Sequence, residues 1–271
     1  MQQNAARPIP RRSPRLLAAS ALSALLLAGM PAAVAAQGAA GTEPAAVAAG
    51  SRLLTPDTVA IALVDHQPAV AFPITSIDRQ TLVSNSVALT KTARAFGVPL
   101  VLSTIREDSS GPLFAEIIAA APGVPVVRRP TFRNAWYDPN FVRAVEATGR
   151  RKLVMAGLWT EVCLALTAQS AVEAGYQVYV VTDASGGTTK EAHDMAVQRM
   201  IQAGAIPVTW LQVNRELLDA SSPAPQRLNA AIREIDKDHS GALGLVWEMN
   251  EVSALREANG PSTATSRPGR R

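Results

Sequence analysis

Hydrophobic positions along the chain fall into short continuous runs that are separated by longer stretches with helical periodicity. Apolar runs of about four to eight residues, bounded by turn residues, are typical of buried strands. Five runs of this kind occur, the last one weaker than the others: TVAIALV (58–64), GVPLVLST (97–104), KLVMAG (152–157), QVYVVTDA (177–184) and AIPVTW (205–210).

Between these runs the apolar residues recur at helical spacing. The helical patterns involve Leu82, Leu89, Ala93 and Phe96, and then residues 140–148, 161–174 and 190–203. Strands and helices that alternate at this spacing indicate βαβ units, in which right-handed crossovers place the strands parallel. The pattern therefore predicts an α/β fold in which helices cover both faces of an open, mostly parallel sheet.

Both ends of the chain depart from this pattern. In residues 1–36, four arginines precede an apolar run over 16–29 that is too short to span a bilayer, and AAVAAQ (32–37) supplies small residues for cleavage. We expect residues 1–36 to be a signal peptide, on the general secretory or the twin-arginine route, and residues 37–54 to be a linker. The protein is then periplasmic or secreted. We expect the folded domain to cover 55–220, and 221–271 to form a C-terminal appendage that is partly helical, over 227–237, before a disordered tail.

The net charge changes when the signal peptide is removed. The four arginines of that segment have no acidic counterpart and equal the whole formal net charge of +4, so the mature chain is about neutral (4 − 4 = 0). Residues 261–271 carry three further arginines and no acid, which leaves the part between slightly acidic. This distribution gives no basic patch for a phosphate backbone, so we expect no nucleic-acid partner, and no membrane association after cleavage.

Cys163 is the only cysteine of the chain. A lone cysteine cannot form an intramolecular disulfide in an exported protein, so it is either buried or reactive. Thr160 is a plausible N-cap that would place Cys163 in the first turn of a helix, where backbone amides and the helix dipole make a thiol unusually acidic. Cysteine is also among the most frequently buried residues. Local physics leaves both interpretations open.

Two candidate residues fall at the same edge of the predicted sheet. Asp65 directly follows the first strand, and the segment 158–163 follows the third predicted strand. In open parallel sheets, ligands bind outside the carboxyl ends of the strands. A carboxylate at this edge could accept the proton of the Cys163 thiol and so activate it as a nucleophile.

Several motifs in order along the chain resemble one known family. They are ALVDHQ (62–67), GPLFAEI (111–117), NAWYDPNF (134–141), VMAGLWTEVCLALTAQSAVEAGYQVYVVTDASG (154–186) and RMIQAGA (199–205). The sequence is similar to the isochorismatase-like cysteine hydrolases, and within them to the YcaC-type subgroup. The resemblance implies a three-layer α/β/α fold, an Asp, Lys, Cys triad that hydrolyses amides of small molecules, no cofactor, and a homo-oligomer.

Carried over by motif, the resemblance makes Cys163 the nucleophile and Asp65 its base. It also implies a cis peptide bond between Leu158 and Trp159, with the backbone amides of Trp159 and Cys163 forming the oxyanion hole. These assignments agree with what a thiol nucleophile requires, a proton acceptor and donors for the developing negative charge.

The chain departs from the family at the lysine of the triad. At that place VVRRPTF (126–132) offers Arg128 and Arg129, and an apparent insertion leaves the register ambiguous. We prefer Arg129, because arginine can hold the carboxylate of Asp65 and balance a thiolate, although it cannot easily shuttle a proton. The alternative is that both arginines form an exposed basic pair in a loop.

No metal site is expected. The metal-dependent nicotinamidases carry an Asp-x-His pair after the second strand, and residues 103–114 contain no histidine. His66 follows Asp65 but should point away from it, and His193 lies in a predicted helix where a structural hydrogen bond is the better interpretation. Isolated histidines do not make a zinc site by spacing. We take Asp183 as structural, bonding loop amides.

The candidate pocket residues are Phe72, Asn134, Trp136 and Thr160, which fall in loops near the predicted strand ends. Together with the triad they predict an exported cysteine hydrolase that cleaves a small-molecule amide or other carbon–nitrogen bond. One alternative is a non-catalytic or weakly active binding protein of the same fold, which the arginine in the lysine position supports. Another is a vinyl-ether hydrolase of the isochorismatase type, against which Cys163 argues.

Overall fold

The predicted apolar runs form the strands of a parallel sheet in the computed structural model, which describes residues 51–258. Within these residues the sheet has six strands: β1 (Val59–Val64), β2 (Leu100–Ile105), β3 (Val126–Arg129), β4 (Lys152–Gly157), β5 (Gln177–Val181) and β6 (Ile206–Val208). Their order is β3-β2-β1-β4-β5-β6, and all neighbouring strands pair in parallel. The expected open parallel sheet is confirmed.

The strand order places a topological switch point between β1 and β4. From β1 the chain moves outward through β2 and β3, then returns to β4 on the other side of β1. The register aligns Val64 with Gly157, so both central strands end at the same level. A crevice opens outside the carboxyl ends of strands at such a point, and ligands bind there.

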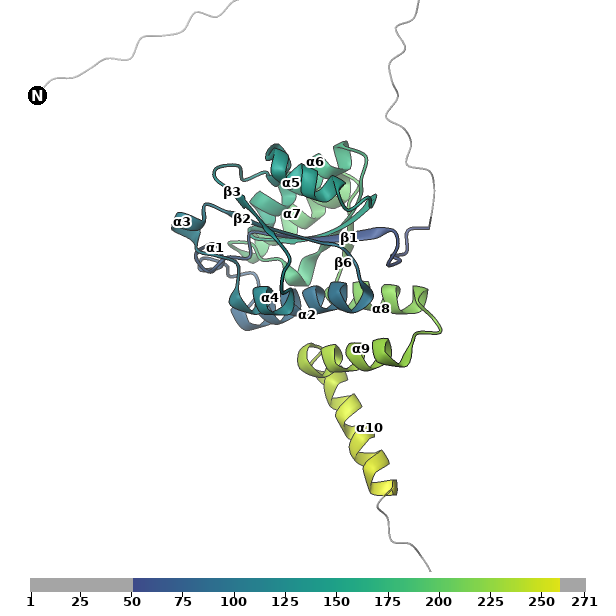
Figure 1. Ribbon diagram of the computed structural model, residues 1–271. Helices are drawn as coiled ribbons and strands as arrows, with labels where there is room; N and C mark the ends of the chain where they lie inside the picture. Colours follow the sequence, from purple (N-terminus) through teal and green to yellow (C-terminus); the bar gives the residue numbers. More distant parts are fainter. Residues whose placement is uncertain (1–50, 259–271) are drawn as a thin grey trace, which may run out of the picture. The chain divides into compact units, whose positions relative to one another are not determined.

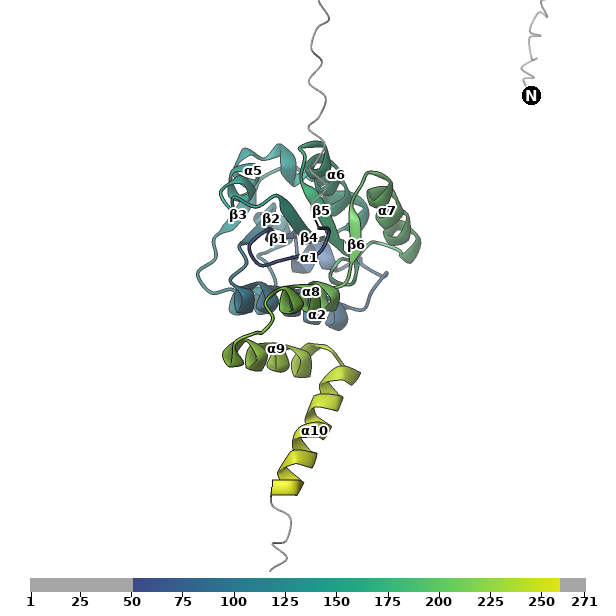
Figure 2. The ribbon, with the colours of Figure 1, turned by 90° about the vertical axis from the view of Figure 1, so that its right-hand side faces the viewer.

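Helices cover both faces of the sheet, which gives the expected three layers (Figures 1 and 2). One face carries α2 (Arg79–Phe96), α4 (Ala115–Ala120) and α8 (Trp210–Ala220), and the other carries α5 (Pro139–Glu146), α6 (Ala165–Glu173) and α7 (Lys190–Gln202). Side chains of β1 alternate between the two cores: Ile61 packs in the α2 layer, whereas Ala62 packs in the α6 layer. This period of two is the geometry of a strand buried on both faces.

Strand β3 was not expected from the sequence. It has four residues, VVRR, and only Arg129 among them is fully buried. An edge strand pairs with one neighbour and leaves part of its surface in water, so it needs no continuous apolar run. The periodicity analysis therefore did not identify β3, because two of its four residues are arginines.

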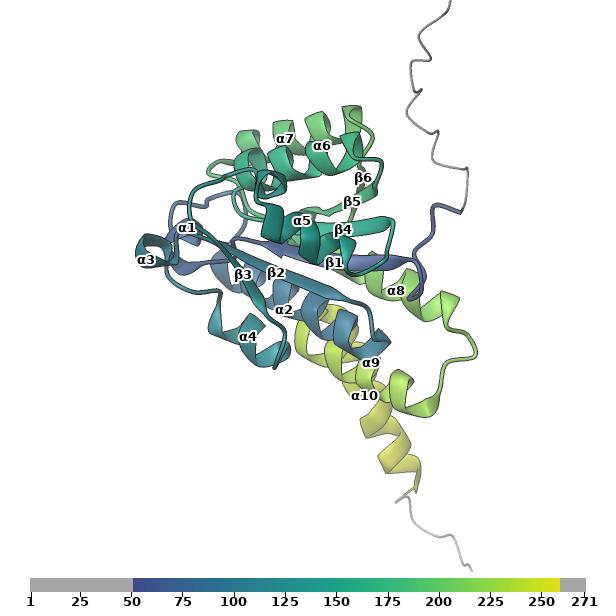
Figure 3. The ribbon, with the colours of Figure 1, turned by 45° about the horizontal axis from the view of Figure 1, so that its top comes forward.

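The segment after Ala220 is helical and packs on the domain. It forms α9 (Gln226–His239) and α10 (Ala242–Ala258). Helix α9 lies against α2 and contributes Ile232 and Ile235 to the core of that layer, and α10 contacts α9 (Figure 3). The amphipathic pattern over 227–237 thus marks α9, which is part of the domain's packing rather than a separate appendage.

The folded domain also begins slightly earlier in the chain than residue 55, where the sequence placed its start. Leu54 is fully buried, and its backbone amide donates to Glu216 on α8 at 2.9 Å. Leu54, the last residue of the predicted linker, is therefore packed, whereas residues 51–53 are exposed. The predicted signal peptide, the linker up to residue 50 and the tail after 258 lie outside the described residues. Within 51–258, none of the helices has the length and apolarity needed to cross a bilayer.

Candidate active site

Asp65 is held at the switch point by an unusual backbone conformation. It follows β1 directly, has φ of 61°, and donates its amide to the carbonyl of Ser103 on β2 at 2.9 Å. Aspartate is among the few residues that enter the left-handed region routinely, because its short polar side chain bonds locally. The side chain is fully buried. A carboxylate is thereby fixed in the crevice where ligands are expected.

Arg129 forms a buried ion pair with Asp65. The last residue of β3, it donates from Nη2 to Oδ1 of Asp65 and from Nη1 to the carbonyl of Phe132, and both charged side chains are 0% exposed. Arg128 has a side chain that is 70% exposed and pairs with Glu107 at 2.7 Å. Alternation along β3 sends the two arginines to opposite sides, so Arg129 faces Asp65 and Arg128 faces solvent.

Cys163 lies in a π-helical turn, Thr160–Leu164, that precedes α6. Only 6% of the residue is exposed. The expected N-cap is wrong: Thr160 is the first residue of the turn, not its cap, and its hydroxyl bonds to Nδ1 of His193 at 2.9 Å. Turns of this kind often occur at functional sites, where the extra residue redirects a side chain.

Burial has the largest effect on the pKa of the Cys163 thiol. Desolvation raises the pKa of Cys163, and the neighbouring carboxylate of Asp65 raises it further, while Arg129 and the backbone amide of Trp159 lower it by smaller amounts. The expectation of an unusually acidic thiol is therefore wrong, because loss of water outweighs the dipole and the guanidinium.

The carboxyl of Asp65 is the natural acceptor of the thiol proton. Burial raises its pKa above the ordinary value, and the charge and hydrogen bond of Arg129 and a hydrogen bond with Cys163 oppose the rise. Oδ1 is engaged by Arg129, whereas Oδ2 has no nitrogen or oxygen partner among the described residues. A raised pKa makes the Asp65 carboxylate a stronger base toward the thiol than an ordinary aspartate.

The peptide bond between Leu158 and Trp159 is cis, as the resemblance implied. The Trp159 indole donates from Nε1 to the carbonyl of Val70 on the short helix α1 (Pro68–Ala71) at 2.6 Å. The backbone amide of Trp159 interacts with the Cys163 sulfur. Trp159 thus supplies both a wall of the site and a donor beside the nucleophile.

A cavity of about 300 Å³ opens at Cys163. This volume is at the lower end of small-molecule sites. Its walls come from α1, the end of β2, the short helix α3 (Glu107–Ser110), the loop after β3 and the turn after β4. The lining residues are Ala69, Val70, Ile105, Arg106, Ser109, Ser110, Thr131, Arg133, Trp159, Val162 and Cys163.

The four candidate pocket residues do not line this cavity. Phe72 is 81% exposed beyond the end of α1. Asn134 is buried and bonds to the amide of Trp136 at 3.0 Å, and Trp136 packs edge-on against neighbouring aromatic rings. Thr160 is buried against His193. Asn134, Trp136 and Thr160 thus hold loops together without facing the cavity, and Phe72 faces solvent.

Sequence reasoning missed most of the cavity wall. Arg106 directly follows β2, so the strand-end rule that selected Asp65 also applied to it. Arg133 and Thr131 follow β3, which was not recognised as a strand. Ser109 lies in α3, a four-residue helix without a hydrophobic pattern. The missing information was the course of β3 and its loop.

His66 and Gln67, the two residues after Asp65, have structural roles. Gln67 joins the loop after β1 to the end of β2, because its amide nitrogen donates to the carbonyl of Ile105 at 3.0 Å and its oxygen accepts from the amide of Ile105 at 2.7 Å. His66 bonds through Nε2 to the carbonyl of Ala184 at 2.9 Å. Asp183 accepts from the amide of Trp210 at 2.9 Å, which is the structural role expected for it.

Buried His66 should make the protein sensitive to acid. Desolvation lowers its pKa from 6.5 to about 4, so the unfolded state binds the proton more tightly and stability falls as the pH drops through this window. The loss should reach about 3 kcal/mol in all. Urea unfolding from pH 7 to 4 measures it, with His66→Gln as the comparison, since glutamine keeps a donor for Ala184. Parallel stability curves for the two proteins would contradict this assignment.

Comparison with known proteins identifies the domain. The Isochorismatase domain family matches residues 59–212, which is more than half of the chain. The chain belongs to the isochorismatase family. The protein named Probable hydrolase YcaC of Escherichia coli K12 is 41% identical over 165 residues, which cover 60% of this chain and 79% of that protein.

Two solved structures share this isochorismatase fold. The YcaC structure from E. coli, described as an octameric hydrolase of unknown specificity, matches with a TM-score of 0.70 at 35% identity. The YcaC structure from Pseudomonas aeruginosa, with hexane-2,5-diol and covalent acrylamide, matches with a TM-score of 0.68 at 33% identity. Each match covers 76% of this chain and 98% of the other. The predicted resemblance to the YcaC-type subgroup is confirmed.

Proposed function

We propose that the protein is a cysteine hydrolase that cleaves an amide or another carbon–nitrogen bond of a small molecule through a thioester on Cys163. The observation that carries this proposal is the buried Asp65–Arg129 ion pair beside the Cys163 thiol at one cavity. A buried carboxylate with one free oxygen next to a thiol is the arrangement that a general base and its nucleophile require. The name of the E. coli relative, a probable hydrolase, agrees with it.

In the acylation step, the sulfur of Cys163 attacks the carbonyl carbon of the substrate while its proton moves to Oδ2 of Asp65. A carbon–sulfur bond forms, and the carbonyl oxygen takes the negative charge. The backbone amides of Trp159 and Cys163 donate to this oxygen. The protonated carboxyl then gives its proton to the leaving nitrogen, the carbon–nitrogen bond breaks, and an amine departs.

Deacylation reverses the roles of these groups. Asp65 accepts a proton from a water molecule, the hydroxide oxygen attacks the thioester carbon, and the carbon–sulfur bond breaks. The proton returns to sulfur, and a carboxylic acid or carbamic acid leaves. Arg129 keeps its charge throughout and balances whichever partner is negative, carboxylate or thiolate. No step needs an oxidant or a metal, and we propose that the protein uses no cofactor.

A relative with this fold has been found with a covalently bound small molecule. The P. aeruginosa YcaC structure holds covalent acrylamide, and acrylamide is an acceptor for thiolate nucleophiles. The second candidate is a binding protein with little turnover, favoured by Arg129 in the place of the family's lysine, because arginine does not exchange a proton at neutral pH. The presence of Cys163 argues against a vinyl-ether hydrolase.

The location and assembly of the protein are further proposals. The segment 1–36 has the composition of a signal peptide, which supports export to the periplasm or the medium. A homo-oligomer is supported by the octameric E. coli relative and by large apolar side chains on α10 that are exposed in a single chain: Leu245, Val246, Met249 and Val252.

A screen of the purified protein against small amides, ureas and N-carbamoyl compounds tests the function. We expect turnover of at least one compound, unaffected by dialysis against EDTA, and none by Cys163→Ser. Among the described residues, no group of three or more histidine, cysteine or acidic side chains is placed to hold a metal ion. Turnover that persists in Cys163→Ser would refute the nucleophile, and EDTA-sensitive turnover would refute the cofactor-free chemistry.

A further inference from the structure

Two arginines give the cavity beside Cys163 a positive wall. Arg106 and Arg133 both line it, Arg106 directly after β2 and Arg133 in the loop after β3. The lining contains no aspartate or glutamate. Its remaining polar side chains are hydroxyls, and its apolar ones come from α1, the end of β2 and the turn that carries the nucleophile. The cavity lining thus carries two cationic side chains and no acidic one.

Neither of these arginines is neutralised by an acidic side chain of the described residues. Among residues 51–258, neither arginine has an ion-pair or side-chain hydrogen-bond partner. Glu107, next to Arg106 in the chain, pairs with Arg128, and Asp65 pairs with Arg129. Asp108, also near Arg106 in the chain, forms no ion pair with either arginine within residues 51–258. Both guanidinium groups are therefore available to a ligand.

The backbone holds Arg106 at the mouth of the cavity. Its φ is 47°, in a region that non-glycine residues seldom adopt, and its amide donates to the carbonyl of Arg129 at 2.8 Å. Its own carbonyl accepts from the amides of Ser109 and Ser110, at 3.0 and 2.8 Å. Such a strained conformation persists only where surrounding contacts fix it, and it is enriched at ligand sites.

We infer that the cavity selects substrates that carry a carboxylate a few bonds away from the scissile carbon–nitrogen bond, with Arg106 and Arg133 binding the carboxylate. The inference rests on the proposed function. A guanidinium group presents paired donors that match a carboxylate, and two of them in the cavity that Cys163 also lines can orient the substrate as well as attract it. The monoamide of a short dicarboxylic acid has the required chemistry and fits a cavity of about 300 Å³.

Alkylation of the thiol tests this charge selection independently of hydrolysis. Iodoacetate and iodoacetamide each react by forming a carbon–sulfur bond and releasing iodide, and they differ chiefly in the negative charge of the first. Because Cys163 is the only cysteine, labelling reports on this site alone. Each rate constant is divided by that of the same reagent with N-acetylcysteinamide, so that intrinsic reactivity cancels.

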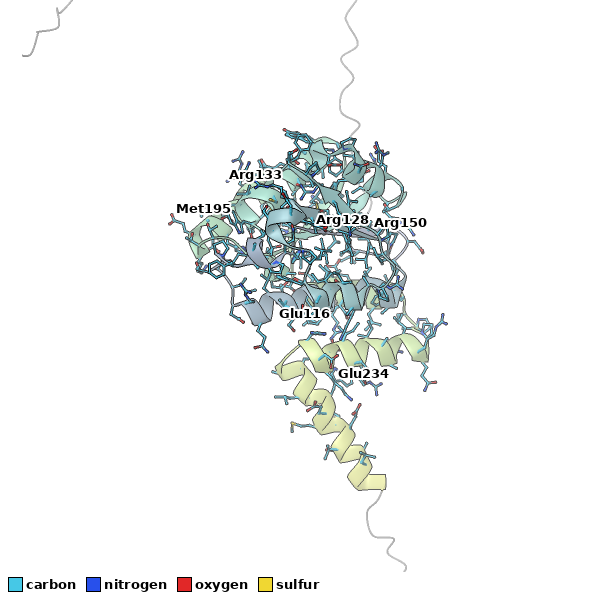
Figure 4. All side chains as sticks on the ribbon, turned by 60° about the vertical axis from the view of Figure 1, so that its left-hand side comes forward. Glu116, Arg128, Arg133, Arg150, Met195 and Glu234 are labelled. Carbon is cyan, nitrogen blue, oxygen red and sulfur yellow. The ribbon has the colours of Figure 1, made fainter. Side chains whose placement is uncertain are left out.

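We expect the normalised rate for iodoacetate to exceed that for iodoacetamide by about fivefold or more at low salt, and the preference to shrink as ionic strength rises. Arg106→Gln and Arg133→Gln should each reduce it by about twofold or more, and the double variant should abolish it. Arg150→Gln is the matched control, because Arg150 lies apart from Arg133 (Figure 4), is outside the cavity lining and forms no ion pair within residues 51–258. It should keep the full preference.

Three results would overturn the inference. The first is a ratio of normalised iodoacetate to iodoacetamide rates at or below one, and the second is a ratio that does not change in the double variant. The third is folded protein that neither reagent labels. In turnover, succinamate should be preferred over butanamide in the same arginine-dependent way. Arginine-dependent selection of iodoacetate without hydrolysis of any amide would remove the proposed function and leave the anion site standing. Hydrolysis of butanamide in preference to succinamate would remove the anion site and leave the proposed hydrolase function standing.

Discussion

Replacing Cys163 by serine should lower kcat/KM by about 10⁴ or more, and replacing Asp65 by asparagine should lower it by about 10²- to 10⁴-fold. Serine cannot substitute for the thiol, because its hydroxyl is a poorer nucleophile and Asp65 is too weak a base to deprotonate it. Asparagine can neither accept the thiol proton nor return it to the leaving nitrogen. Both losses should fall on kcat rather than on substrate binding, since these groups act as bonds change.

The thiol pKa in Asp65→Asn separates catalysis from simple damage. The charge of Asp65 raises the pKa of Cys163, whereas Arg129 lowers it, so removing the carboxylate should lower the thiol pKa. A variant with a more acidic thiol but slower acylation would show that proton delivery to the leaving group is limiting. Iodoacetamide labelling against pH measures the pKa, and single-turnover kinetics measure acylation.

Asp183→Asn is the matched control for this prediction. Asp183 also follows a strand of the sheet and is partly buried, but its Oδ1 accepts from the amide of Trp210, a role that asparagine can fill. It should change neither the acylation rate nor the thiol pKa. Equal losses in Asp183→Asn and Asp65→Asn, or an unchanged thiol pKa in Asp65→Asn, would remove Asp65 from the role of base.

The fold and the position of two site residues could be predicted because they rest on strong patterns. Strands buried on both faces must be continuously apolar, so β1 and β4 were evident. Once parallel strands are assigned, the carboxyl edge follows, and it locates Asp65 and Cys163 without further information. The sheet order, in contrast, depends on contacts between distant segments that periodicity does not encode.

The character of the site was less predictable than its location. Burial of the thiol depends on how the turn after β4 packs, and it reversed the expected shift of the pKa of Cys163. Whether Arg128 or Arg129 faces Asp65 depends on the pairing of β3 with β2, in which Ile105 aligns with Arg129. Arg106 could have been found from its position at the end of a predicted strand. Arg133 could not, because it lies in the loop after β3 and that strand was not predicted.

Arg129→Ala should be among the most damaging single substitutions in the domain. It leaves the carboxylate of Asp65 buried without a partner, which destabilises the fold by about 3 to 5 kcal/mol. Activity should fall by about 10²-fold or more, because the charge that balances carboxylate and thiolate is lost. Arg128→Ala, at an exposed ion pair, should cost less than about 1 kcal/mol and leave activity intact.

Arg129→Lys decides what the basic member of the triad does, and it stays informative if the alanine variant does not fold. The guanidinium binds Asp65 and the carbonyl of Phe132 through two different nitrogens. An ammonium keeps the charge but cannot reproduce that fork, so an electrostatic role predicts activity within about tenfold of the natural protein. A proton-exchanging role predicts that lysine raises the rate.

The pH–rate profile distinguishes these roles from a purely structural one. Arg129 holds the pKa of Asp65 below the value that burial alone would give, so weakening this interaction should move the acid limb of the profile to higher pH. The limb should shift slightly in Arg129→Lys and further in Arg129→Ala, but not in Arg128→Ala. If the arginine only braced the β3 loop, stability would fall with no shift of the limb, and the catalytic unit would reduce to Cys163 and Asp65.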